Sequence, residues 1–270
     1  MRRFVAAVAQ MASGADRARN VGRASELVRT AAARGARLVV LPEVFAWRGP
    51  REAESDQAET IPGPTSDALA AVARETCVWL CMGSVLERGP HDGGGRSWNT
   101  SVLVSPSGEI AASYRKIHLF DVELPGRVSV RESDARAPGT QVVTVSTELG
   151  TIGMAVCYDL RFPELFRRQV AAGAELLTLP SAFTFVTGAA HWAVLCRARA
   201  IESQCYLLAA NQTGPSAHGH LDFGHSMIVD PWGTVLAEAP EGEGLAMAEI
   251  DRDYVVRVRR EMPCLEHRRL

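Results

Sequence analysis

Cys157 stands where a nucleophile is commonly found. The apolar segment from Thr151 to Val156 predicts a strand that stops at this cysteine, and Pro163, a residue suited to the first helical turn, predicts a helix soon afterwards. A thiol at a strand-to-helix turn is held rigidly, with nearby backbone N–H groups free to point at a ligand. The alternative is that Cys157 is a small buried apolar residue, as most free cysteines are.

Two charged residues occupy the same kind of position. Glu43 follows Leu-Val-Val-Leu-Pro and Lys116 follows Ala-Ser-Tyr-Arg, each just past a predicted strand. Open α/β sheets place their sites beyond the carboxyl ends of the strands, so these side chains and Cys157 are candidates to meet in one crevice. The alternatives are that Glu43 caps a helix and that Lys116 is a solvated strand end.

The chemistry of the three groups is complementary. A thiol needs a base to become a thiolate, and Glu43 can serve as that base. Lys116 offsets the cost of burying the carboxylate. With the backbone N–H of Tyr158, it can also stabilise the oxyanion of a tetrahedral intermediate. These residues predict a cysteine-dependent acyl-transfer site.

Strand and helix patterns alternate along the chain, which predicts an α/β fold with a largely buried sheet or pair of sheets and helices outside. The expected helices are 17–34, 64–75, 163–172, 189–203 and 252–261. The expected strands are 4–10, 37–41, 78–86, 99–105, 110–115, 141–146, 151–156, 176–179, 206–210, 225–229, 234–237 and 245–250. Residues 91–96 are expected to form a surface loop. Residues 118–139 form the longest stretch predicted to be irregular, and a loop of that length is usually functional.

Composition narrows the class of protein. The chain has 270 residues, of which 47% are hydrophobic, and no repeat or linker divides it, so residues 1–270 are expected to form a single domain. The net charge of −2 gives no reason to expect nucleic acid or an anionic membrane as a partner. The six cysteines lack the spacing of a zinc site or a disulfide framework, which favours reduced thiols, a cytoplasmic location and no metal.

Three blocks of the sequence resemble the signature blocks of the nitrilase (carbon–nitrogen hydrolase) superfamily. They are Leu-Pro-Glu43, Tyr-Arg-Lys116-Ile-His-Leu-Phe and Gly-Met-Ala-Val-Cys157-Tyr-Asp-Leu-Arg-Phe-Pro-Glu-Leu, and the similarity covers essentially the whole chain. The resemblance implies a Glu43–Lys116–Cys157 catalytic triad and a second glutamate, Glu132, that orients the lysine and the substrate. No metal or organic cofactor is implied.

The resemblance also implies a fold and an assembly. The expected fold is an αββα sandwich of two mixed β-sheets flanked by helices. The expected assembly is a homodimer or higher homo-oligomer whose sandwiches stack into a four-layer αββα-αββα structure. The helix after Cys157 and the tail Met262–Leu270 are the candidate interface elements.

Within the superfamily, the chain is most similar to the deaminated-glutathione amidase branch, and the ω-amidase branch shares many of the same features. The segments that carry this similarity are Phe120–Gly126, Pro180–Gly188, Ala190–Trp192 and Arg197–Glu202. The resemblance implies hydrolysis of a terminal carboxamide, in a small carboxylate-bearing substrate of the deaminated-glutathione type, to an acid and ammonia through a thioester. The open alternatives are ω-amidase activity on α-ketoglutaramate, hydrolysis of an N-carbamoyl amide or a nitrile, and a noncatalytic scaffold of the same fold.

Arg161 is the candidate for substrate recognition. A guanidinium binds a carboxylate through a two-pronged fork, and related carbamoylases hold a substrate carboxylate with an arginine at the matching place. The alternative is a structural salt bridge to Asp159 or Glu164. Thr187 and His191 are also expected to line the pocket.

Overall fold

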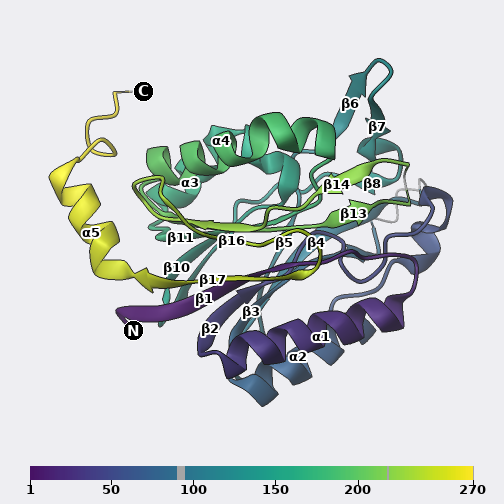
Figure 1. Cartoon of the computed structure of the whole chain (residues 1–270), viewed down its shortest axis with the longest axis horizontal. Coiled ribbons are helices and arrows are strands. Elements are labelled where there is room, and N and C mark those ends of the chain that lie inside the picture. The colour runs from purple at the N-terminus through teal and green to yellow at the C-terminus, as the bar shows by residue number, and fades with distance from the viewer. Residues whose placement is uncertain (90–94, 218, 270) are drawn as a thin grey trace.

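Two mixed β-sheets pack face to face, and helices cover the outer face of each sheet (Figure 1). The computed structural model describes residues 1–89, 95–217 and 219–269. This arrangement confirms the predicted αββα sandwich. Residues 91–94 of the predicted surface loop at 91–96 lie outside the described residues.

The first sheet has helices α1 (Arg17–Ala33) and α2 (Pro64–Thr76) on its outer face (Figure 1). Its strands, in spatial order, are β17 (Gly244–Asp251), β1 (Arg3–Gln10), β2 (Ala36–Val40), β3 (Trp79–Glu87), β4 (Ser97–Val104) and β5 (Ile110–Arg115), and the short strand β8 (Arg136–Ala137) pairs with β4.

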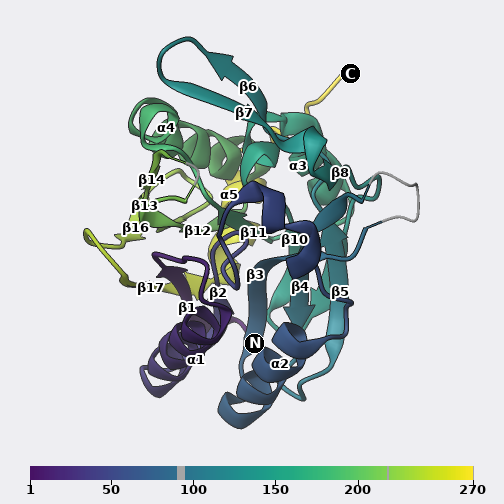
Figure 2. The same ribbon diagram turned by 90° about the vertical axis from the view of Figure 1, so that its right-hand side faces the viewer.

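The second sheet has helices α3 (Pro163–Ala171) and α4 (Phe185–Ser203) on its outer face (Figure 2). Its strands, in spatial order, are β16 (Val235–Glu238), β15 (Met227–Val229), β12 (Tyr206–Asn211), β11 (Leu176–Ser181), β10 (Gly150–Met154) and β9 (Thr144–Thr147). Helix α5 (Arg252–Glu261) lies at one end of the sandwich, near the N-terminus (Figure 1).

Alternating side chains of the strands divide the core into layers. On β2, Leu38 and Val40 belong to the cluster between the two sheets, whereas Val39 belongs to the cluster under α1 and α2. Successive side chains of a strand point to opposite faces, so the continuous apolar run of β2 reflects a strand that is buried on both sides. No helix within the described ranges is long and apolar enough to cross a lipid bilayer.

The predicted irregular stretch at 118–139 is largely structured, which corrects the expectation from the sequence. It contains a hairpin of β6 (Asp121–Leu124) and β7 (Val128–Arg131), a 3₁₀ turn at Glu132–Asp134, and β8. The hairpin projects beyond the sandwich in both views (Figures 1 and 2). Its strands have only four residues each, too few for a clear alternating pattern, although the Pro-Gly pair between them is a turn signal.

Several elements differ from their predicted limits by two or three residues, among them β9, β11 and β15, and two segments near the site differ more. Helix α4 begins at Phe185, four residues before the predicted start at residue 189, because the Thr184 side chain accepts a hydrogen bond from the Thr187 N–H and caps the helix. The polar segment after β12 forms a second short hairpin, of β13 (Thr213–Pro215) and β14 (Leu221–Phe223).

A bulge in β3 receives the turn that follows β2. The β3–β4 register shifts between Cys81 and Ser84, and Gly83 adopts a φ of +66° there. The Ser84 hydroxyl accepts a hydrogen bond of 2.9 Å from the Val44 N–H. A Cβ on Gly83 would lie 2.0 Å from the Pro42 carbonyl oxygen. Only glycine therefore lets the Pro42–Val44 turn approach this closely.

Gly83→Ala is expected to lower the free energy of unfolding by roughly 2–4 kcal/mol, because the new methyl group meets a backbone carbonyl in a conformation that favours glycine. Gly22→Ala in α1 is the matched control. An added Cβ meets nothing within 4 Å at Gly22, and helix propensity predicts a gain of up to about 1 kcal/mol. Chemical denaturation measures both values, and equal stability of the two variants would contradict this account of the bulge.

Candidate active site

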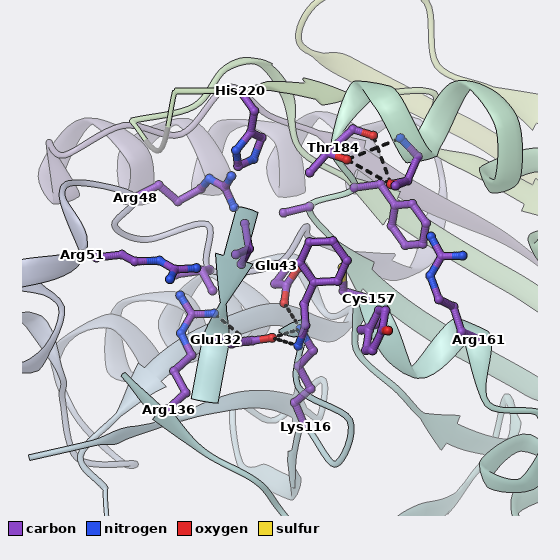
Figure 3. A pocket seen from close by; sticks show the side chains of 17 residues that line it. Glu43, Arg48, Arg51, Lys116, Glu132, Arg136, Cys157, Arg161, Thr184 and His220 are labelled. Atoms are coloured by element: carbon purple, nitrogen blue, oxygen red, sulfur yellow. Dashed lines mark hydrogen bonds and ion pairs between the residues drawn. The ribbon is translucent and has the colours of Figure 1, made fainter. Parts of the chain in front are cut away.

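A pocket at the carboxyl ends of β2, β5, β10 and β11 gathers most of the predicted site residues (Figure 3). It contains about 640 Å³ of space, including the part open to solvent. The predicted residues that line it are Glu43, Lys116, Glu132, Cys157, Tyr158, Arg161 and Thr187. The other lining residues are Val44, Arg48, Arg51, Phe120, Val130, Arg136, Ala182, Phe183, Thr184 and His220.

Glu43 is buried at the turn after β2, and its backbone is fixed on both sides. Its N–H donates to the Ser181 carbonyl at 3.3 Å, and its own carbonyl accepts from Gln212 Nε2 at 3.0 Å. Residues 43–46 form a turn, so the alternative that Glu43 caps a helix is wrong. The β3 bulge and these two bonds aim the carboxylate into the pocket.

Lys116 joins two carboxylates at the floor of the pocket. Its Nζ donates to Glu43 Oε1 at 2.9 Å and to Glu132 Oε2 at 2.8 Å. Only 2% of the side chain is exposed, so the alternative of a solvated strand end is wrong. Burial by itself lowers the pKa of Lys116, but the charges of Glu132 and Glu43 outweigh burial and raise its pKa above the ordinary value.

Glu132 is held by two cations and by the base of the β6–β7 hairpin. Besides Lys116, Arg136 Nη1 donates to its Oε1 at 2.8 Å, and the Phe120 N–H donates to its Oε2 at 2.7 Å. Burial by itself raises the pKa of Glu132, but the charges of Lys116 and Arg136 outweigh it and lower the pKa to about 2. Glu132 is therefore ionised at neutral pH.

Cys157 occupies a strained backbone position after β10. Its φ is +48°, a region that residues other than glycine rarely adopt. A 3₁₀ turn over Cys157–Arg161 follows, and its first backbone donor is the Asp159 N–H, which bonds to the Val156 carbonyl at 3.1 Å. The N–H of Tyr158 precedes that donor, at the position where helical turns leave their N–H groups unused.

The thiol environment disfavours a resting thiolate. Burial raises the pKa of Cys157 well above its ordinary value, and the nearby charge of Glu43 raises it further. The charge of Lys116 and a backbone hydrogen bond from Ala182 lower the pKa of the thiol, but burial and Glu43 outweigh them. Cys157 is thus buried, as the apolar alternative required, but its side chain lines the pocket beside a carboxylate and an ammonium.

Asp159 ties the turn of Cys157 to the strand that carries Lys116. Its Oδ2 accepts from the Val156 N–H at 2.9 Å and from the Tyr114 hydroxyl at 2.7 Å. Its Oδ1 accepts from the His118 N–H at 3.1 Å and lies 2.7 Å from His118 Nδ1. A single buried carboxylate therefore fixes the spacing between the two segments.

Arg161 lies against aromatic rings and not against a carboxylate. Its guanidinium sits 5.4 Å from the ring centre of Phe183, and Nη1 is 3.3 Å from His191 Nδ1. No carboxylate in the described part of the chain forms an ion pair with Arg161, and Asp159 has its acceptors engaged elsewhere. The structure thus lacks the structural salt bridge that was the alternative.

The other two predicted binding residues lie at different depths. Thr187 lines the pocket, and its hydroxyl lies 3.0 Å from that of Thr184. His191 is exposed on α4 and is not among the lining residues, so it reaches the pocket only through Arg161.

Sequence reasoning missed several cationic residues of the wall. Arg136 forms a two-pronged ion pair with Glu54, in which Nε donates to Oε2 at 3.1 Å and Nη2 donates to Oε1 at 2.9 Å. Arg136 also lies four residues after Glu132, a spacing typical of ion pairs. Arg48 forms a buried ion pair of 2.7 Å with Asp222. Arg51 donates to the Arg131 carbonyl at 3.1 Å. The sequence also gave no indication of Asn99, a buried residue of β4 that touches both glutamates.

The arrangement is suited to acyl transfer. A buried thiol, a carboxylate and a fixed ammonium meet in one pocket, where burial strengthens electrostatic stabilisation of an oxyanion. Within the described residues, no group of three or more His, Cys, Asp and Glu side chains is placed to hold a metal ion.

Comparisons with known proteins identify the family. A family model for carbon–nitrogen hydrolases matches residues 5–260. The deaminated glutathione amidase of Bos taurus is 46% identical over 267 residues, which are 97% of this chain and 81% of that protein. The omega-amidase NIT2 of Danio rerio is 36% identical over 269 residues, which are 100% of this chain and 96% of that protein.

Solved structures agree with this assignment. The crystal structure of the Caenorhabditis elegans NitFhit protein matches with a TM-score of 0.93 and 40% identity, over 100% of this chain and 66% of that longer chain. The predictions of a sandwich fold and of a hydrolase for non-peptide carbon–nitrogen bonds are confirmed, and the chain belongs to the carbon–nitrogen hydrolase family.

Proposed function

We propose that this protein hydrolyses a linear amide of a small carboxylate-bearing substrate through a thioester on Cys157. The observation that carries the proposal is the position of Lys116, whose ammonium joins Glu43 and Glu132 in the pocket that the Cys157 side chain also lines. Membership of the carbon–nitrogen hydrolase family supports the same reaction class.

In the first half of the reaction, Glu43 takes the proton of Cys157 as the sulfur attacks the carbonyl carbon. Because burial and the charge of Glu43 raise the pKa of the thiol, the proton leaves during the attack and not before it. The developing oxyanion is stabilised by Lys116 and by the Tyr158 N–H. Glu43 then returns the proton to the leaving nitrogen, and a thioester remains.

In the second half, Glu43 takes a proton from water as the water oxygen attacks the thioester. Collapse of the tetrahedral intermediate breaks the carbon–sulfur bond, and Glu43 returns the proton to sulfur. Glu132 carries no proton in either half, because Lys116 and Arg136 keep its pKa near 2 despite its burial. Its role is to orient Lys116, while Glu43 is the proton carrier.

The charges of the wall point to the substrate class. Arg48, Lys116 and Arg136 are each paired with a carboxylate of the protein. Arg51 and Arg161 have no such partner among the described residues, and they lie on opposite sides of Glu43 and Lys116 (Figure 3). Two unpaired guanidinium groups suit a substrate with a carboxylate on each side of the scissile amide.

Deaminated glutathione fits this description, because its amide joins a 2-oxo acid to cysteinylglycine and each part carries a carboxylate. For that substrate the leaving group is an amine, whereas ammonia leaves from a primary carboxamide. α-Ketoglutaramate, the second candidate, is such a carboxamide and has one carboxylate. We assign Arg161 to the acyl side of the substrate and Arg51 to the leaving-group side.

We also propose that the protein is a homodimer that forms through α4. This helix exposes two apolar side chains seven residues apart, and therefore on one face, Val194 and Ile201, of which Val194 is 67% exposed. The exposed face of α3 is polar and charged. Apolar surface on one helix is typical of an interface, so we place the contact on α4 and not on α3 or the C-terminal tail. Pairing of the outer helices of two sandwiches would give the four-layer stack.

Cys157→Ala is expected to abolish amide hydrolysis and leave the melting temperature nearly unchanged, since the side chain only loses its nucleophile. Glu43→Gln is expected to slow alkylation of Cys157 by iodoacetamide by about 10²-fold or more, because the thiol loses its base. Release of amine or ammonia and the mass of the alkylated protein are the measurements. Cys264→Ser, at an exposed cysteine, is the control with normal activity. Normal turnover by Cys157→Ala would rule out the mechanism.

Arg51→Gln is expected to raise the KM for deaminated glutathione by about 10-fold or more, the loss typical of one charge-assisted hydrogen bond, and to leave the KM for α-ketoglutaramate within about twofold. Arg161→Lys is expected to raise the KM for both. Arg127→Gln, at the exposed tip of the β6–β7 hairpin, is the control for loss of charge. Equal effects of Arg51→Gln on both substrates would contradict the two-sided assignment.

Light scattering is expected to give about twice the chain mass of 29.1 kDa for the wild type. Val194→Glu should reduce the mass to that of a monomer, because a charge on an apolar interface is left unpaired. Val256→Glu, at a residue of α5 that is also exposed, should remain dimeric. A monomeric wild type would refute the assembly, and a dimeric Val194→Glu would place the contact elsewhere.

A further inference from the structure

Asn99 lies buried between the two glutamates of the site. Asn99 is 1% exposed and lies on β4. Its backbone carbonyl accepts a hydrogen bond of 2.9 Å from the backbone N–H of Lys116. Its side-chain nitrogen donates to Glu43 Oε1 at 2.7 Å and to Glu132 Oε1 at 3.3 Å. Ionised carboxylates only accept hydrogen bonds, so the amide nitrogen and not its oxygen must face them.

The hydrogen bonds to Glu43 give its two carboxylate oxygens different roles. Oε1 accepts from Lys116 at 2.9 Å and from Asn99 at 2.7 Å, so both of its favourable acceptor directions are used. In the described part of the chain, no hydrogen bond from another group reaches Oε2, and Glu43 lines the same pocket as the Cys157 thiol, whose pKa its charge raises. The oxygen left to exchange a proton is therefore Oε2.

Asn99 makes these contacts at a cost to the fold. Its Oδ1 is buried and has no hydrogen-bond partner within the described residues. An unsatisfied buried acceptor is destabilising, and this cost offsets part of the stabilisation that the two donated hydrogen bonds provide. The amide at this position is thus better explained by what its nitrogen does for the glutamates than by a contribution to stability.

We propose that Asn99 is a positioning residue for amide hydrolysis: together with Lys116 it occupies Oε1 of Glu43, and it thereby reserves Oε2 for the proton. The inference rests on the proposed roles of Glu43 and Cys157. In each half of the reaction the proton of the thiol or of water moves to Oε2, and it leaves from Oε2 to the departing nitrogen or sulfur. Oε1 keeps both of its donors throughout, so the carboxyl group does not rotate between steps.

The test compares Asn99→Leu with the wild type on α-ketoglutaramate and on deaminated glutathione. The expected result is a fall in kcat per folded molecule of about 10²-fold, the size of a loss of positioning, with KM within about twofold. Alkylation of Cys157 by iodoacetamide at neutral pH should slow by a similar factor. A purely structural asparagine would instead lower the melting temperature and leave kcat per folded molecule unchanged, and that result would overturn the proposal.

Asn99→Asp keeps the shape of the side chain and covers the case in which Asn99→Leu does not fold. An added negative charge beside Glu43 stabilises the protonated form of the cluster, so the acidic limb of kcat/KM should move to higher pH. An unmoved limb would overturn the proposal. So would an Asn99→Leu effect confined to KM, because that would place Asn99 in contact with the substrate.

Thr100→Val is the matched control on the same strand. Neighbouring side chains of a strand point to opposite faces, and the Thr100 hydroxyl donates to Glu87 Oε2 at 2.6 Å, away from the pocket. Its kcat and alkylation rate should equal those of the wild type. If the wild type hydrolyses neither amide, the substrate assignment fails, yet the alkylation rates still decide whether Asn99 positions Glu43.

Discussion

The site depends on the burial of one ammonium between two carboxylates. Charged groups removed from water are stable only when they are paired and hydrogen-bonded. Lys116 meets this requirement through Glu43 and Glu132, and the pairing continues from Glu132 through Arg136 to Glu54. The pocket floor is therefore a chain of alternating charges, and displacing either cation leaves a carboxylate without an ion-pair partner: Glu43 without Lys116, or Glu54 without Arg136. This constraint gives the two glutamates different roles, because only Glu132 is held by two cations.

Backbone features supply the precision that charge alone lacks. The β3 bulge at Gly83 seats the turn of Glu43, and the carboxylate of Asp159 joins the turn of Cys157 to the segment of Lys116. Neither feature belongs to the reacting groups. The bulge and the Asp159 carboxylate each hold a turn that follows a strand, so the reacting side chains are fixed to the rigid sheets. Positive φ values at Val44 and Cys157 mark the points where this rigidity forces the chain into an uncommon conformation.

The resemblance of the sequence to a known family was sufficient for the sandwich, and the place of Glu43, Lys116 and Cys157 just past strand ends made them candidates for one crevice. That the crevice lies where strand ends of both sheets meet, β2 and β5 of the first and β10 of the second, is visible only in the fold. The sequence did not predict that Asn99 contacts the two glutamates of the site. A polar residue inside a strand resembles any residue of a half-exposed face until its neighbours across the sheet are known. The ion pair of Arg136 with Glu54 joins residues 82 positions apart, and no local pattern reports such a pairing. The hairpin of β6 and β7 was missed because its strands are too short to show a period.

The β6–β7 hairpin is closed at its base, where it meets the segment of Glu132, and Arg51 of the pocket wall donates to the Arg131 carbonyl at the end of β7. The Glu132 N–H donates to the Phe120 carbonyl at 3.2 Å, and the Ser133 N–H donates to Asp121 Oδ1 at 3.0 Å. Phe120 and Val130 of the same unit line the pocket. Residues added to or removed from the tip would therefore alter how deep the pocket is without moving Glu132. A change in the length of this tip would thus adapt the entrance to molecules of different length, while the charged residues beneath it keep their positions.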